Sequence, residues 1–239
     1  MEIRPLSARS VVLSLLLGNH PPVLAGSALV EAGRYFGIAE STLRVALTRM
    51  VAAGELERTD GDYRLAGRLV ERQQRQDDAI DPVTTAWDGT WTTVVITTTG
   101  RSAAERAELR VRLGDLRLAE LREGVWMRPA NLARALPDWP GSLITVLTAT
   151  PGDPHVLTRS LWDLEGWTAT GTALLTAMAT IDPTRRLAAA AALVRHLRTD
   201  PALPEALLPR DWNAPELRSA YAAYQAEIAE RAIRITPRL

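Results

Sequence analysis

Residues 39–65, with the sequence AESTLRVALTRMVAAGELERTDGDYRL, decide how the N-terminal part of the chain folds. Apolar residues recur there at helical spacing: Leu43, Leu47 and Met50. They predict a helix from about Ala39 to Ala53 with one buried face, and Gly54 ends it. Short segments flank the turn pair Asp60-Gly61, a pattern typical of a two-stranded β-hairpin.

Two further helices are expected upstream of this stretch. Ser7 is placed as an N-cap before an apolar stripe that stops at Gly18, and a second helix fits Ser27 to Phe36. Pro21-Pro22 separates the two, because successive prolines are incompatible with a helix interior. The order helix, helix, turn, helix, hairpin predicts a winged helix-turn-helix over residues 1–66.

The face of the third helix opposite its apolar stripe is predicted to enter the major groove of DNA. Arginine can form bidentate bonds to guanine, hydroxyl side chains can contact bases or phosphates, and that face holds no carboxylate. The candidate DNA contacts are Ser41, Thr42, Arg44, Val45, Thr48 and Arg49, together with Arg58 and Arg64 of the hairpin, which are placed to reach phosphates.

A second interpretation stays open, in which these arginines form an ordinary solvated face, because helix-turn-helix geometry also occurs in interaction modules. Residues 1–75 hold ten Arg against eight Asp and Glu, an excess too small to indicate a polyanionic partner by itself. Acidic residues also follow the third helix, and each would repel a DNA backbone that it approached: Glu55, Glu57, Asp60 and Asp62.

The composition is that of a globular chain: 239 residues, 46% hydrophobic and 23% charged, with a formal net charge of zero. All 28 basic residues are arginine. The sequence has no cysteine and only three scattered histidines, so we expect no disulfide, no metal site and no cofactor. Without an apolar stretch of ~18 to 20 residues or a signal peptide, we expect a cytoplasmic protein with no membrane contact.

Residues 67–86 form a charged, glutamine-rich connector, expected to be a solvated helix, and residues 87–152 follow the order βαββαβ. That order predicts a ferredoxin-like domain, which also resembles the fold of Cas2-type ribonucleases. Its second helix is placed at Asn131 to Leu136. A metal-dependent nuclease needs a carboxylate where the first strand ends, and residues 97–101 (TTTGR) have none, which favours a dimerisation and sensing domain.

Residues 153–239 are predicted to be helical, with breaks at Gly166-Trp167, at Asp182-Pro183 and across the proline-rich span 201–215. The expected fold class is therefore α+β: a winged helix-turn-helix, a ferredoxin-like middle domain and a helical C-terminal region. Ser160 and His155 do not form a nucleophile and base, because no Gly-x-Ser-x-Gly elbow surrounds the serine. No catalytic residue is assigned.

Short sequence blocks follow one another over almost the whole chain. They are residues 7–10 (SARS), 36–38 (FGI), 43–44 (LR), 49–51 (RMV), 54–56 (GEL), 87–91 (WDGTW), 124–129 (GVWMRP), 161–164 (LWDL), 200–204 (DPALP) and 207–212 (LLPRDW). In this order the blocks resemble those of a known family, the PaaX-type transcriptional repressors of phenylacetate catabolism.

The resemblance implies a homodimeric, GntR-like winged-helix repressor of double-stranded operator DNA. A small effector would release it, typically an aryl-acetyl coenzyme A thioester such as phenylacetyl-CoA. If the effector acts by changing the spacing of two recognition helices, we expect the connector from Gly67 to Ile80 to transmit the change. Trp126 and Arg128 are candidate effector contacts, because an aryl ring stacks on indole and a guanidinium suits an anionic carrier. Alternatives left open are a Cas2-like nuclease, an enzyme acting on a coenzyme A thioester, and a repressor or activator with a different effector or none.

Overall fold

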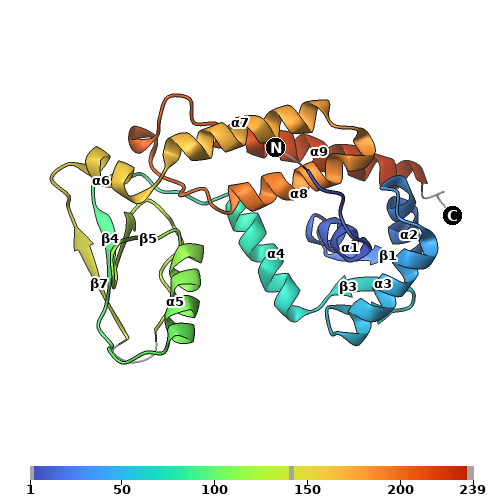
Figure 1. Ribbon diagram of the computed structural model, residues 1–239, viewed down its shortest axis with the longest axis horizontal. Coiled ribbons are helices and arrows are strands. Elements are labelled where there is room, and N and C mark those ends of the chain that lie inside the picture. The colour runs from blue at the N-terminus through green and yellow to red at the C-terminus, as the bar shows by residue number, and fades with distance from the viewer. Residues whose placement is uncertain (1–2, 140–142, 236–239) are drawn as a thin grey trace. The chain divides into compact units, whose positions relative to one another are not determined.

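The computed structural model describes residues 3–139 and 143–235 (Figure 1). The chain divides into two compact units, each built from segments that are separated in sequence. The first unit contains the chain up to Ile80, Gly171–Leu197 and the chain from Ala214 onward, and the second contains Asp81–Thr170 and Arg198–Asn213. Helices from the C-terminal part of the sequence therefore belong to the same unit as the predicted DNA-binding elements.

The N-terminal elements have the order of a winged helix. They are α1 (Ala8–Leu17), β1 (Val23–Ala25), α2 (Gly26–Tyr35), α3 (Glu40–Ala52), β2 (Leu56–Thr59) and β3 (Asp62–Leu65). The strands form one antiparallel sheet in the order β1-β3-β2. The helices and the hairpin confirm the sequence prediction, and β1 adds a third strand to it.

Local signals set the ends of these elements. The Ser7 hydroxyl accepts a hydrogen bond from the backbone N–H of Ser10, so α1 begins at its predicted cap. Gly37 and Gly54 follow α2 and α3 with φ angles of 76° and 64°, which glycine adopts without steric strain. The turn residues Asp60 and Gly61 have φ angles of 51° and 93°, and a type I′ hairpin requires both to be positive.

An apolar cluster packs α1, α2 and α3 against the three-stranded sheet. Its largest fully buried side chains are those of Leu16, Leu29, Leu43, Met50, Leu56 and Leu65. Gly33 of α2 faces α3 closely, because a Cβ atom built there would lie 2.9 Å from Cδ1 of Leu43. The apolar face of α3 is therefore fixed on the core, and its rotation about the helix axis is set by packing.

The first unit also contains helices from the rest of the chain: α4 (Gly67–Ile80), the later part of α7 (Leu164–Thr180), a short 3-10 turn (Pro183–Arg185), α8 (Arg186–Leu197) and α9 (Ala214–Ile235). The prediction of a solvated connector helix is wrong for α4. Gln73 and Gln76 on one face of α4 are only 4% and 8% exposed. These two glutamines are buried because their side-chain amides donate hydrogen bonds to the C-terminal end of α1.

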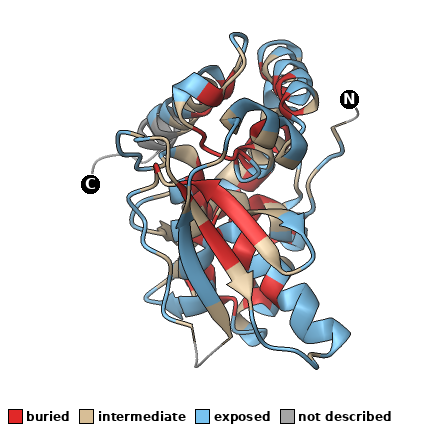
Figure 2. Cartoon of the chain, turned by 90° about the vertical axis from the view of Figure 1, so that its left-hand side faces the viewer, coloured by how far each residue is buried: buried red, intermediate tan, exposed pale blue. Residues whose placement is uncertain are grey.

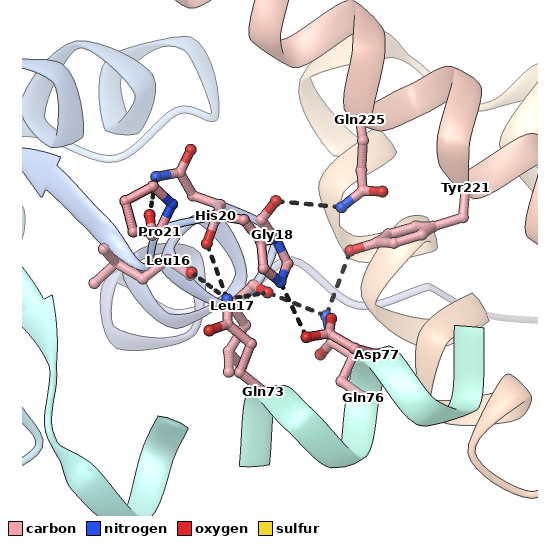
Figure 3. A network of polar contacts seen from close by, with 11 residues as sticks. Leu16, Leu17, Gly18, His20, Pro21, Gln73, Gln76, Asp77, Tyr221 and Gln225 are labelled. Carbon is pink, nitrogen blue, oxygen red and sulfur yellow. Dashed lines mark hydrogen bonds and ion pairs between the residues drawn. The ribbon is translucent and has the colours of Figure 1, made fainter. Parts of the chain in front are cut away.

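A polar network holds the C-terminal end of α1 (Figure 3). The Gln73 side-chain amide donates to the carbonyl oxygens of Leu17 at 3.0 Å and Asn19 at 2.9 Å. The last carbonyls of a helix have no partner within the helix, and burying them unpaired is costly. Gln73 supplies the missing donor from α4, which explains why a polar residue is buried there.

Helix α9 supplies donors and acceptors to the same network (Figure 3). The Gln225 amide donates to the carbonyl of Gly18 at 3.2 Å, and the Gln76 amide lies 3.5 Å from the hydroxyl of Tyr221. Burial raises the pKa of Tyr221 to about 12, with a smaller contribution from Asp77, so the hydroxyl stays protonated at neutral pH. Side chains from α4 and α9, which are far apart in the sequence, thus cap the C-terminal end of α1.

Loss of the Gln73 amide is expected to destabilise the first unit. Gln73→Ala removes the donor of the Asn19 carbonyl and leaves the Leu17 carbonyl with only the 3.5 Å contact from Gln76, which should cost about 1 to 3 kcal/mol. Gln74→Ala on the same helix is the matched control, because Gln74 is exposed, and it should change stability by less than about 0.5 kcal/mol. Urea denaturation measures both variants, and equal midpoints would contradict the capping role.

The second unit contains a four-stranded antiparallel sheet in the order β5-β6-β4-β7. Its elements are β4 (Trp91–Ile96), α5 (Ala103–Asp115), β5 (Ala119–Arg122), β6 (Val125–Pro129), β7 (Ile144–Ala149), α6 (Pro154–Leu161), the first part of α7 and a 3-10 turn (Glu205–Leu207). The strand order is that of a ferredoxin-like fold, as predicted. Figure 2 shows buried central strands and an exposed outer strand, β7.

The predicted helix from Asn131 to Leu136 is wrong, because the described residues 130–139 contain no helix. The backbone of this segment bonds to residues before β4 instead: Asn131 accepts from the N–H of Thr85 at 2.7 Å, and Ala133 donates to Val83 at 3.1 Å. The Asn131 amide also donates to the carbonyl of Ala202 at 2.9 Å. Partners far away in the sequence therefore outcompete the local helical bonds.

The predicted break at Gly166-Trp167 is also wrong, since α7 runs through it. The Gly166 N–H donates to the Asp163 carboxylate at 2.9 Å, which places the glycine in the capped first turn and not at a helix end. Trp167 stacks on Trp212 with ring centroids 4.1 Å apart. This stacking fixes the start of α7 in the second unit.

Candidate nucleic-acid interface

The predicted recognition face of α3 is exposed along its whole length. Its members are Ser41, Thr42, Arg44, Val45, Thr48 and Arg49, and all six are exposed. Val45 is 49% exposed, although it is a large apolar side chain. On a helix fixed by its opposite face, such a residue is available to the methyl group of a thymine.

The arginines of this face have different surroundings. Arg44 donates to the Glu40 carboxylate at 2.8 Å through Nε, and Arg34 of α2 binds the other oxygen of the same carboxylate. These hydrogen bonds, first from Arg44 and then from Arg34, lower the pKa of Glu40. Among the described residues Arg49 forms no ion pair, so its guanidinium needs no exchange of partners to contact DNA.

Thr48 has a more limited role as a donor. Its hydroxyl donates to the backbone carbonyl of Arg44 at 3.1 Å, one turn earlier in α3. The oxygen keeps lone pairs that can accept a bond from a base or a water molecule, but the hydroxyl proton is already used. Thr48 therefore fits an accepting contact better than a donating one.

The wing arginines lie on opposite faces of the hairpin, because Arg58 pairs with Tyr63 and Arg64 pairs with Glu57 in the strand register. The guanidinium of Arg58 lies over the ring of Tyr63, 5.8 Å from the centroid, which limits its freedom. Arg64 is the cross-strand partner of Glu57, so part of its charge is opposed by a carboxylate on the neighbouring strand. Both arginines are exposed, as predicted.

Glu55 does not act as an exposed acid of the wing. The residue is 9% exposed, and its carboxylate accepts hydrogen bonds from Arg9 of α1, at 2.9 Å from Nε and 2.5 Å from Nη2. Arg68 lies 3.8 Å away. The expected repulsion of DNA by Glu55 is therefore offset by two cations, whereas Glu57, Asp60 and Asp62 remain exposed.

A groove of about 650 Å³ runs between the start of α1 and α3. It is lined by Ser7, Ala8, Arg9, Ser41, Thr42, Val45, Ala46, Arg49, Met50, Ala53 and Glu55. Sequence reasoning missed Arg9 as a member of this surface. The available signal was an arginine in the first turn of α1, where the helix dipole disfavours a cation unless an anion is near.

Trp126 and Arg128 lie side by side on β6 and are buried, 6% and 5% exposed. Trp126 packs in the apolar cluster between the sheet and α5. Arg128 donates to the carbonyls of Leu116 at 2.7 Å and Arg134 at 3.0 Å. Burial lowers the pKa of Arg128 to about 10, with smaller effects of Arg117 and Arg134. This geometry favours a structural role for the pair, and their effector contact stays a prediction.

The remaining predicted features of the second unit do not meet in a site. The Ser160 hydroxyl donates to the carbonyl of Leu157 at 2.7 Å, and His155 lies in the first turn of α6. No group of three acidic or histidine side chains suited to a metal ion occurs among the described residues. Within the same residues, no helix has the length and apolar character to cross a membrane.

The N-terminal elements have winged-helix order and an exposed face on α3 that carries arginines, and the second unit has the strand order of a ferredoxin-like sheet. Three family models match in chain order: PaaX-like protein at residues 7–69, PaaX protein central Cas2-like domain at 84–142, and PaaX-like protein C-terminal domain at 166–238. The chain therefore belongs to the PaaX family, a family of transcriptional repressors.

A comparison with solved structures finds a similar fold but adds no function. A solved structure, that of the uncharacterized protein Rv0674 from Mycobacterium tuberculosis, is similar over 95% of this chain and 98% of its own, with 49% identity and a TM-score of 0.85. No curated protein matches the chain. The family thus carries the assignment as a transcriptional regulator.

The ion pair of Glu55 should make stability depend on pH. Hydrogen bonds from Arg9 lower the pKa of Glu55 below its unfolded value of about 4.3, so the stabilisation is present above that pH and is lost as the pH falls through the lower folded value. Glu55→Gln should reduce Tm at pH 7, and its difference from the wild type should shrink towards pH 3.

Glu57→Gln, on the exposed wing, serves as the control and should leave Tm almost unchanged over the same range. Thermal unfolding followed by circular dichroism at several pH values provides the measurement. A difference between Glu55→Gln and wild type that stays constant from pH 7 to pH 3 would show that the ion pair is not its origin.

Proposed function

We propose that this chain is a sequence-specific, double-stranded DNA-binding repressor whose operator affinity is lowered by a small effector. The observation that carries this proposal is the orientation of α3: its apolar face is fixed on the core, and its outer face presents Arg44, Val45 and Arg49 to solvent. Such a face suits the major groove, where arginine distinguishes guanine by two parallel hydrogen bonds.

A homodimer would place two copies of α3 in successive major grooves of a palindromic site. The effector would act by binding better to a dimer whose recognition helices are misplaced, and it can weaken DNA binding by no more than that preference. Because α4 is bonded to α1, we propose that α4 transmits the change as part of the DNA-binding unit and not as a loose linker.

Removal of Arg49 should weaken binding to the preferred DNA sequence. A duplex of about 30 base pairs, selected by the wild-type protein from a random pool, provides the probe for fluorescence anisotropy. Arg49→Ala should cost about 1 to 3 kcal/mol and relax the preference at one position if Arg49 bonds to a base edge. Arg44→Ala should behave similarly at another position.

Arg122→Ala is the matched control, because Arg122 is an exposed arginine on β5 in the other unit. It removes the same charge without altering α3. If the wild type selects a duplex and both Arg44→Ala and Arg49→Ala bind it as Arg122→Ala does, α3 is not the recognition helix. If the wild type selects no duplex, the proposed function fails.

Thermal-shift measurements should identify the class of effector. A ligand that binds only the folded protein stabilises it by about 2.7 kcal/mol at a hundred times its dissociation constant. We expect phenylacetyl-CoA or a related aryl-acyl thioester to raise Tm, and free phenylacetate or coenzyme A to raise it less. A larger shift with the free acid would point to a different effector, and the same thioester should also release the selected duplex.

A further inference from the structure

The groove between α1 and α3 brings together cations from two different helices. Arg9 stands on the α1 side and Arg49 on the α3 side, and the hydroxyls of Ser7 and Thr42 line the groove with them. Its one carboxylate, Glu55, is paired with Arg9 and has Arg68 nearby. The lining as a whole therefore favours an anion.

The contact between Arg9 and Glu55 leaves part of the guanidinium unused. The carboxylate takes Nε and Nη2, which form one edge of the planar group. A guanidinium has five N–H donors, so the end formed by Nη1 and Nη2 keeps donors for a second anion. The side chain of Arg9 is 52% exposed, whereas that of Glu55 is 12% exposed. The buried acid thus holds an exposed cation in one orientation.

A DNA strand is the anion that this position would meet. When a helix lies in a major groove, the sugar-phosphate strands run along both of its flanks, and cations there contact phosphates without reading bases. Arg9 comes from α1, which packs on α3, and it faces the same groove as Arg49. A phosphate oxygen pair matches the end of a guanidinium, which is why arginine is common in phosphate recognition.

We propose that the groove between α1 and α3 receives one sugar-phosphate strand of the operator, with Arg9 binding a phosphate and Glu55 acting as the positioning residue of Arg9. This inference rests on the proposed function and deepens it, because it assigns a backbone contact outside α3 and the wing. It also reverses the expected effect of Glu55: the acid favours DNA binding and does not oppose it.

The sign of the effect of Glu55→Gln tests the positioning role. Gln removes one negative charge, so a simple repulsive acid would give tighter binding to the selected duplex after substitution. Loss of a positioned Arg9 gives weaker binding despite the added net positive charge, and we expect a loss of about threefold to tenfold. In the Arg9→Ala background the same substitution should no longer weaken binding, because there is no arginine left to position.

Salt dependence tests the phosphate contact itself. Arg9→Ala should lower affinity about tenfold on selected and unselected duplexes alike and reduce the slope of log K against log salt by about 0.9, as expected for one phosphate contact. Arg122→Ala should leave the slope unchanged. Arg9→Lys keeps the charge but loses the guanidinium, which can bind an anion at each of two edges. Its affinity for DNA should therefore lie between those of the wild type and Arg9→Ala. If Glu55→Gln fails to fold, Arg9→Lys replaces it as the test of a positioned guanidinium.

The outcomes separate this inference from the proposed function. If Arg49→Ala loses affinity while Arg9→Ala and Arg9→Lys match Arg122→Ala in affinity and slope, the protein reads DNA through α3 and the groove does not hold a strand. If Glu55→Gln binds more tightly than wild type, Glu55 is not a positioning residue. If no variant and no wild-type protein binds a selected duplex, both proposals are wrong.

Discussion

The C-terminal end of α1 imposes the constraint on which the first unit depends. A helix that ends inside a protein leaves its last carbonyl oxygens without a partner in the helix and out of reach of water. These oxygens must therefore accept hydrogen bonds from other donors. Here the donors are the side-chain amides of Gln73, Gln76 and Gln225, contributed by α4 and α9. The same contacts that satisfy α1 therefore join the winged helix to the C-terminal helices. A change in the packing of α4 or α9 has a direct physical route to α1 and, through the apolar cluster, to α3.

The charged groups around α3 follow one pattern: a carboxylate binds an arginine and fixes its direction. Glu40 is shared by Arg34 and Arg44, and Glu55 is bound by Arg9. A count of charges along the sequence treats each acid as a repulsive group, and by that count residues 1–75 are nearly balanced, with ten Arg against eight Asp and Glu. In the folded unit the acids instead lower the freedom of the cations beside them, which reduces the entropy that an arginine loses when it binds a phosphate or a base.

Elements governed by nearby residues were predictable from the sequence, and elements governed by distant partners were not. The helix of Leu43 and Met50 and the Asp60-Gly61 hairpin are encoded by local spacing and turn chemistry, and so was the exposed face of α3. In the segment wrongly predicted as a helix, the Asn131 side chain bonds to the carbonyl of Ala202. On the buried face of α4, Gln73 bonds to the end of α1. Neither partner is visible to a periodicity argument. Arg9 escaped notice similarly, because its importance comes from Glu55, 46 residues away.

Helix α9 is the last part of the polar network around α1 to be synthesised. Gln76 and Tyr221 are separated by 145 residues, and at roughly 5 to 20 residues per second a ribosome needs about 7 to 30 seconds to make the intervening chain. During that interval the nascent winged helix lacks the hydroxyl and amide groups that α9 contributes. The complete set of hydrogen bonds around α1 forms only once α9 has been translated, so during synthesis the N-terminal elements exist for a time without the bonds from Tyr221 and Gln225.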